Sequence, residues 1–400
     1  FPSVIEALSK SVARGTKAPT PITVPHENLA VSMAHGYYLA TGKPQAVMVH
    51  VNVGTANGIC GIMNAARENV PILFTSGRTP LYEEGAAGAR SIFIHWGQEM
   101  FDQAGTVREM VKWDYELRSE RQLEAVVDRA INVAMSEPRG PIYMTLPREV
   151  LAEGAGEFSY QSPTRRQIAH PPAGDPNAVD QAAEWISKAE RPLIIASSFG
   201  QDRGVVADFE TMAERFALPV VTYRPRYLSM ATDHPMHLGF EPGELIKQAD
   251  VILTVESDVP WIPSLHAPNP EAKIIQLGID PLYTKYPMRS FPCDLAITGS
   301  PTSVIPALTE ALADREKAAT PRIDARRIRI AERHGKLREG WAAKLESTRN
   351  GGPTDASWVA HCIDQVKGDD DIMVSESQLA LTNLVFRNPG TFFGTGPSGG

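Results

Sequence analysis

Short apolar runs and longer segments with helical periodicity alternate along most of the chain. A continuous apolar run bounded by turn residues predicts a buried strand, and apolar residues three or four positions apart predict a helix. In the first part of the chain the predicted strands are residues 22–25, 46–51, 71–77 and 140–147, and the predicted helices are residues 1–13, 27–41, 57–68 and 123–137. Such alternation predicts an α/β fold with parallel sheets flanked by helices.

The same pattern begins again after a polar, proline-bearing stretch at residues 153–177. The elements predicted in this second part are strands within residues 191–200, 218–223, 249–258 and 272–280, and a helix at 206–217. Residues 314–346 are charged throughout and predict a solvated helix that joins domains. Acids interleave with the bases there, which disfavours nucleic-acid binding. A third α/β part starts at residue 355, with a strand at 371–377 and a helix at 379–386.

Composition narrows the class of protein. A chain of 400 residues exceeds what one compact core usually holds, and 42% hydrophobic with 22% charged residues is typical of globular proteins. No apolar run is long enough to predict a membrane span, and a net charge of -8 argues against a nucleic-acid surface. Cys60, Cys293 and Cys362 lack disulfide-like spacing, so a reducing, cytoplasmic setting is expected.

Glu27 is the first candidate for chemistry. It follows the short apolar run at 22–25 and opens the next predicted helix. A glutamate in a first turn can simply be favoured by the helix dipole. Alternatively, burial at a strand end would raise its pKa and let it exchange a proton with a ligand near neutrality.

The stretch HVNVGTANGICG, residues 50–61, is the second candidate. His50 ends an apolar strand and is of a type that titrates near neutral pH. Gly54 would let the backbone approach a ligand, and Thr55 and Asn57 offer polar groups near a helix start. A turn with a capping residue and a structural histidine is the alternative.

Two further stretches carry polar groups. Residues 94–105 contain Gln98 among aromatic residues and read either as a surface loop or as part of a site. In SESQLAL, residues 375–381, backbone N–H groups and Ser377 could hold an anion. The chain has no Walker A, GxGxxG or HExxH motif, so nucleotide and zinc sites lose their usual support.

Taken in order, several motifs resemble thiamine-diphosphate-dependent enzymes of the acetolactate synthase and benzoylformate decarboxylase family. These motifs are PHEN, GYYLATGKP, VGTANGICGIMNAARENVPILFTSG, VKWDYEL, EPRGPIYMTLPREV, RPLIIAS, SES and RNPGTFF. The resemblance implies three α/β domains: residues 1–155 as a pyrimidine-binding (PYR) domain, 175–315 as a middle domain and 355–400 as the start of a diphosphate-binding (PP) domain, after a linker at 316–354. The PYR domain's first strand would then precede Phe1, and the magnesium-binding motif of the incomplete PP domain would follow Gly400.

The resemblance also assigns residues. Glu27 matches the glutamate that hydrogen-bonds the cofactor's aminopyrimidine ring, His50 matches a proton-transfer histidine, and Gln98 matches a catalytic glutamine, although Gly97 replaces the aromatic residue beside it. The cofactor-binding residues that it implies are Glu27, Gly54, Thr55, Asn57, Ser377, Gln378, Ser398 and Gly399. No metal ligand is assigned within the chain. Where benzoylformate decarboxylases carry a second histidine, this chain has Trp261, with His266 a few residues later.

The function that the resemblance implies is decarboxylation of a 2-oxo acid, or carboligation, with thiamine diphosphate and Mg²⁺. No motif requires FAD. An acetolactate-synthase-like carboligase is the alternative within this chemistry, and a non-catalytic family member or scaffold subunit is the alternative of another class. The partners expected are a small 2-oxo acid substrate and other copies of the chain, as a dimer or a homotetramer, with no nucleic acid and no membrane.

Overall fold

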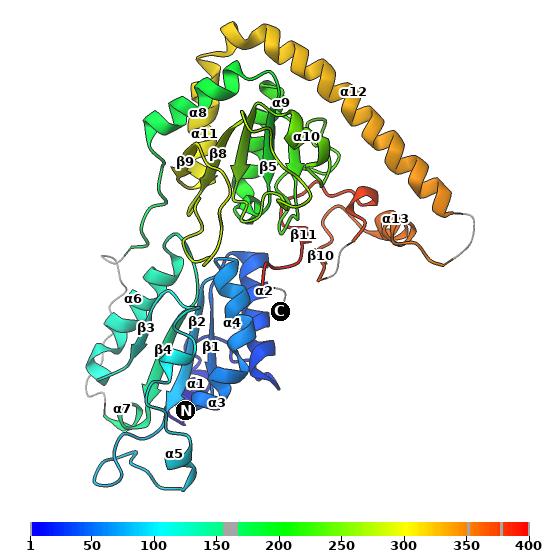
Figure 1. Cartoon of the computed structure of the whole chain (residues 1–400). Coiled ribbons are helices and arrows are strands. Elements are labelled where there is room, and N and C mark those ends of the chain that lie inside the picture. The colour runs from blue at the N-terminus through cyan, green and yellow to red at the C-terminus, as the bar shows by residue number, and fades with distance from the viewer. Residues whose placement is uncertain (1, 155–166, 350–352, 377–378, 399–400) are drawn as a thin grey trace. The chain divides into compact units, whose positions relative to one another are not determined.

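The chain divides into two compact units, Phe1–His170 with Gly396–Gly400, and Pro171–Thr395. The structure is a computed structural model and describes residues 2–154, 167–349, 353–376 and 379–398. Figure 1 shows the order of the elements along the chain. Each unit has a parallel sheet and a core of its own, so the two are described separately.

The first unit contains a four-stranded parallel sheet in the order β1-β2-β4-β3. Its strands are β1 (Gln45–Val49), β2 (Ile72–Arg78), β3 (Asp114–Glu116) and β4 (Ile142–Pro147). Every residue of β4 is buried, as expected for a central strand with helices on both faces. The predicted α/β class is therefore confirmed.

The helices of the first unit are α1 (Pro2–Arg14), α2 (Glu27–Thr41), α3 (Val51–Asn57), α4 (Ile59–Arg67), α5 (Ile94–Gly97), α6 (Leu123–Met135) and α7 (Arg148–Ala152), with the 3-10 turns η1 (Ala104–Thr106) and η2 (Glu120–Gln122). Of these, α2, α4 and α6 contribute buried residues to the cores on the faces of the sheet. Tyr143 joins the core formed with α2 and α4, whereas its strand neighbours Ile142 and Met144 join the core formed with α6. Since successive residues of a strand point to opposite faces, α6 lies across the sheet from α2 and α4.

The second unit contains a five-stranded parallel sheet in the order β6-β5-β7-β8-β9. Its strands are β5 (Pro192–Ala196), β6 (Val220–Thr222), β7 (Val251–Val255), β8 (Lys273–Gly278) and β9 (Leu295–Thr298). β5, β6 and β7 are buried at every position, which explains why the sequence shows them as continuous apolar runs.

The helices of the second unit are α8 (Pro176–Lys188), α9 (Val206–Arg215), α10 (Gly243–Gln248), α11 (Pro301–Ala313), α12 (Glu316–Thr348) and α13 (Ala356–Val366), with the 3-10 turns η3 (Phe199–Gln201), η4 (Arg203–Val205) and η5 (Leu381–Asn383) and the short strand pair β10 (Met373–Val374) and β11 (Phe392–Phe393). α13 packs with η5, β10 and β11 in a small cluster separate from the core of the five-stranded sheet. The charged run is helical, as predicted. Ala319, Ile323 and Ile330 nevertheless bury one face of the first half of α12 in the core of this unit.

Three local predictions are wrong. Residues 22–25 form no strand: Ile22 is 69% exposed, so the segment is not buried in a sheet. The turn expected between the predicted strand 46–51 and the predicted helix 57–68 is already helical, as α3. Residues 379–386 form only the single turn η5, because Leu384 and Phe386 turn inward to pack with Phe392.

The predicted domain boundaries at residues 155, 175, 315 and 355 stay predictions. In the described part of the chain, no helix combines the length and the apolar character that crossing a membrane would need.

Candidate active site

The candidate site of the first unit lies where β1 ends. His50 directly follows Val49 and is the N-cap of α3, but its exposed side chain makes no capping hydrogen bond. The next residue, Val51, has a φ of 39°, a left-handed conformation that is rare for a β-branched residue. Strain of this kind persists only where surrounding contacts enforce it, and it is concentrated at functional sites. Val51 was missed in the sequence, which carries no signal for backbone strain.

Glu27 is held against α3 from the start of α2. Asn57 Nδ2 donates to Glu27 Oε2 over 3.1 Å. Gly54 lies at the closest approach: a Cβ added there would be 3.3 Å from Glu27 Oε1 and 2.9 Å from the Cβ of Val49. The structure thus brings Glu27, Gly54 and Asn57 together at one end of β1.

The protonation of Glu27 differs from the expectation. The Glu27 backbone N–H and the Asn57 amide lower the pKa of this carboxyl group, against a small opposing effect of burial, and the charges of His26 and His50 lower it further. The expected rise of its pKa through burial is wrong for this chain, because the side chain is only half-buried. Glu27 is therefore an ionised hydrogen-bond acceptor at neutral pH.

Thr55 faces the sheet. Its fully buried hydroxyl donates to the Val51 carbonyl over 2.7 Å and lies 2.7 Å from the Tyr143 hydroxyl. Ser76 Oγ is 2.5 Å from the same Tyr143 oxygen, and Gln103 Nε2 donates to it over 2.9 Å. This buried network anchors α3 on the sheet. The geometry therefore does not favour a direct contact between the Thr55 side chain and a cofactor.

Tyr143, Ser76 and Gln103 were missed by sequence reasoning. The signal was present for two of them, since Ser76 and Tyr143 are polar residues inside apolar strand patterns, VPILFTSG and GPIYMTLP. Buried polar groups require partners, so two such residues on predicted neighbouring strands point to a shared network. Gln103 lies in an irregular segment and gave no comparable signal.

Gln98 is half-buried at the end of α5, in the loop after β2. The neighbouring Glu99 fixes this loop: Arg78 and Arg90 pair with its carboxylate at 2.7 and 2.6 Å, and the Thr79 hydroxyl donates to it over 2.6 Å. Within the ranges that the structure describes, no contact joins Gln98 to Glu27 or His50. Its catalytic role stays a prediction.

The remaining predicted residues lie near the end of the chain. Ser398 donates a hydrogen bond to Asn64 of α4. Ser377, Gln378 and Gly399 lie outside the described residues. No group of three or more His, Cys, Asp or Glu side chains that could hold a metal ion occurs among the residues described.

Trp261 and His266, which stand near the place of the second histidine of benzoylformate decarboxylases, lie in the second unit. Trp261 is 2% exposed and packs edge-on against Phe291, with ring centroids 5.2 Å apart. His266 Nε2 lies 3.7 Å from a Glu241 carboxylate oxygen. Trp261 is thus a core residue of this unit.

A parallel sheet with polar groups at the carboxyl end of a strand is typical of α/β proteins that bind small molecules. Residues 3–106 match the N-terminal TPP binding domain of thiamine pyrophosphate enzymes, and residues 179–308 match their central domain. The chain therefore belongs to the thiamine pyrophosphate enzyme family. The first match lies in the first unit and the second match lies in the second unit.

Several known proteins are similar to this chain. An acetolactate synthase of Arthrospira platensis is 28% identical over 221 residues, which are 54% of this chain and 36% of that protein. A benzoylformate decarboxylase of Pseudomonas aeruginosa is 23% identical over 384 residues, 92% of this chain and 66% of that protein. The solved structure of a benzoylformate decarboxylase from Polynucleobacter necessarius shares the fold, with a TM-score of 0.72 at 18% identity over 94% of this chain and 67% of that chain. The chain spans about half the length of the curated relatives that it matches.

Proposed function

We propose that this chain belongs to an enzyme that uses thiamine diphosphate and Mg²⁺ to decarboxylate a 2-oxo acid, in the manner of a benzoylformate decarboxylase, or to join the product to a second carbonyl compound. The observation that carries the proposal is the Glu27 carboxylate, held by Asn57 beside Gly54 at the end of β1. This arrangement lies within the residues that match the TPP binding domain.

The residues at this end of β1 fit the pyrimidine ring of thiamine diphosphate. One Glu27 oxygen accepts from Asn57, while the other lies beside Gly54, whose lack of a side chain lets α3 approach this carboxylate closely. An ionised carboxylate is a strong acceptor for an N–H group of such a ring. When bound, thiamine diphosphate supplies the electron sink that decarboxylation requires. The Glu27 carboxylate would share a proton with the ring nitrogen, as the acceptor.

His50 is the proposed proton donor and acceptor on the substrate side. Its side chain is exposed, makes no capping bond at α3, and lies close enough for its charge to lower the pKa of Glu27. An imidazole so placed can transfer protons near neutral pH. Gln98 belongs to the same proposal as a substrate-side residue.

The remaining parts of the proposal rest on the comparisons and on composition. The match to an acetolactate synthase supports carboligation as the alternative reaction, and a non-catalytic or scaffold role is the alternative of another class. Three free cysteines fit a reducing, cytoplasmic location. Homo-oligomerisation is also proposed, and FAD is no part of the proposal.

The full-length protein, supplied with thiamine diphosphate and Mg²⁺, should be tested against a panel of aliphatic and aromatic 2-oxo acids. CO₂ release with a free aldehyde would support the decarboxylase, whereas release with a coupled hydroxyketone would support the carboligase. Neither product from any acid, with cofactor bound, would favour the non-catalytic alternative.

The role of Glu27 is tested by Glu27→Gln in the same protein. This nearly isosteric change should keep the fold and the cofactor, yet slow exchange of the thiazolium C2 proton by about 10²–10⁴-fold, the usual effect of losing a positioned acid–base group. NMR-followed exchange measures it. His50→Ala should leave exchange nearly intact while slowing turnover, and Glu109→Gln at an exposed position is the matched control. Unchanged exchange in Glu27→Gln would remove this residue from the mechanism.

A further inference from the structure

A pocket of about 290 Å³ lies in the second unit, between α12 and the amino ends of neighbouring strands. Pro192 and Leu193 begin β5, Pro219 directly precedes β6, and Gln248 lies just before β7. Ligands of open α/β sheets normally bind at the carboxyl ends of the strands. This pocket opens at the opposite end, so the sheet topology does not predict it. It also lies in a different unit from Glu27.

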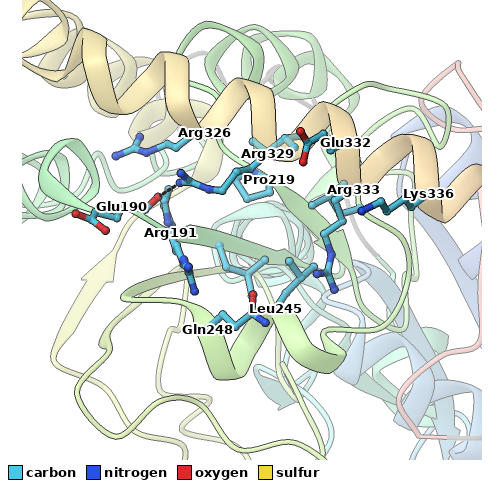
Figure 2. Close-up of a pocket in the computed structure, with 14 residues that line it drawn as sticks. Glu190, Arg191, Pro219, Leu245, Gln248, Arg326, Arg329, Glu332, Arg333 and Lys336 are labelled. Atoms are coloured by element: carbon cyan, nitrogen blue, oxygen red, sulfur yellow. Dashed lines mark hydrogen bonds between the residues drawn. The ribbon is translucent and has the colours of Figure 1, made fainter.

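The pocket has an apolar floor and a cationic rim. The floor consists of Pro192, Leu193, Pro219, Leu238, Leu245 and Ile330, and the rim carries Arg191, Arg329, Arg333 and Lys336. Figure 2 shows Arg191 on one side and Arg333 on the other, both extending toward α10, which contributes Leu245 and Gln248. A volume near 300 Å³ is at the lower end of the range for small-molecule sites.

Positive charge exceeds negative charge in this pocket, although the chain as a whole has a net charge of -8. Five cationic side chains, the four of the rim with Arg326, face only the two carboxylates of Glu190 and Glu332. In the part of the chain that the structure describes, the side chains of Arg191, Arg333 and Lys336 form no hydrogen bond or ion pair. Arg329 donates to the Glu190 carbonyl oxygen, over 2.5 Å.

Arg326 adds a buried charge to the pocket wall. It is 2% exposed, and its Nη2 donates to carbonyls at the end of α8, including that of Ile186 over 2.8 Å. Its buried Nε has no hydrogen-bond partner among the described residues. Burial, with the charges of Arg322 and Arg329, lowers the pKa of Arg326 to about 10, and Asp250 opposes the shift. An anion in the pocket would offset this crowding of like charges.

We propose that this pocket binds a small organic anion, a carboxylate or phosphate group carried on a compact apolar body. The guanidinium groups of Arg191 and Arg333 would bind the anionic group, since their planar donors match carboxylate and phosphate oxygens. The apolar body would lie on Leu193, Leu245 and Ile330. The site is separate from the proposed catalytic function and does not depend on it.

Calorimetric titration of the full chain with 4-phenylbutyrate and with phenyl phosphate tests the proposal. At least one of the two anions should bind saturably. The neutral 4-phenylbutanol and inorganic phosphate should each bind at least about tenfold more weakly, because each lacks one of the two interactions. Binding of the anion should weaken between about 0.15 M and about 1 M NaCl, as expected for exposed charges.

Variants locate the binding. Arg191→Met and Arg333→Met should each raise the Kd about tenfold, whereas Arg14→Met, at an exposed arginine of α1 in the first unit, should leave it unchanged. Circular dichroism checks that each variant folds. Absence of saturable binding by both anions, equal binding of inorganic phosphate, or equal losses in Arg14→Met and the two pocket variants would each overturn the proposal.

Discussion

Among single residues, Gly54 has the closest contacts at the candidate site. It lets α3 lie against Val49 and Glu27, because any side chain there would collide with the Val49 Cβ at 2.9 Å. Gly54→Ala should therefore lower the free energy of unfolding by about 1–3 kcal/mol, the usual cost of overpacking. Urea unfolding of the full chain measures this cost.

Gly36, in the exposed interior of α2, is the matched control, since nothing lies within 4 Å of a Cβ added there. Gly36→Ala should stabilise the chain by about 0.5–1 kcal/mol, because alanine is the better helix former. Equal effects of the two substitutions, in either direction, would show that close packing at Gly54 is not the cause.

A second residue, His237, should make stability depend on pH. It is fully buried, and burial together with the charges of Arg338, His334 and His234 lowers its pKa to about 3. In the unfolded chain a histidine has a pKa of about 6.5. Between about pH 3 and pH 6.5 the unfolded state therefore binds more protons than the folded state. Stability should rise with pH across this window, by at most about 1.4 kcal/mol per pH unit from this group.

His237→Gln retains a partner for Thr222, which lies 2.8 Å from the ring, but cannot titrate. Its free energy of unfolding should change less steeply than that of the wild type between about pH 5 and pH 6.5. Urea titrations at several pH values compare the slopes, with His170→Gln, at an exposed histidine, as reference. A wild-type slope retained in His237→Gln would contradict the prediction.

At the level of elements, Tyr143 connects a helix, two strands and a loop. Its hydroxyl forms hydrogen bonds with the hydroxyls of Thr55 in α3 and Ser76 in β2, and Gln103, just before η1, donates a third hydrogen bond to it. Tyr143→Phe would leave these buried groups short of a partner and should cost about 1–3 kcal/mol. Tyr115→Phe, whose hydroxyl bonds Gln122 at the surface, should cost less than about 0.5 kcal/mol. Midpoints of urea unfolding compare the two, and similar costs would rule out the buried network as the cause.

Elements that are long or fully buried could be predicted from the sequence. β4, β5 and β7 are mostly apolar and buried at every position, and α2 and α6 have clear periodicity. The segments at 22–25 and 379–386 could not, because side-chain packing and prolines decide short elements more than local pattern does. The resemblance to family motifs predicted that Glu27 and the residues after β1 belong to one site. The pKa direction of Glu27 did not follow, since it depends on exposure and on Asn57.

At the scale of the whole molecule, association between copies is the remaining question, and one helix of the first unit carries a row of exposed apolar side chains. Leu29, Met33 and Tyr37 of α2 are 46%, 44% and 48% exposed. Their spacing of four places them along one side of the helix. Large exposed side chains in such a row are typical of a surface that binds another protein. This row supports the proposal that copies of the chain associate.

The last prediction tests that association in the full-length protein. Leu29→Glu with Met33→Glu should convert the oligomer into monomers, because each carboxylate would lose its water on burial in an apolar contact. Sedimentation velocity measures the change, and Ile328→Glu, on α12 and 63% exposed, is the control that should leave the oligomer intact. Should the wild type sediment as a monomer while fully active, self-association would be unnecessary for function. Should the double variant stay oligomeric, copies would associate through another surface, and the exposed row on α2 would need a different partner.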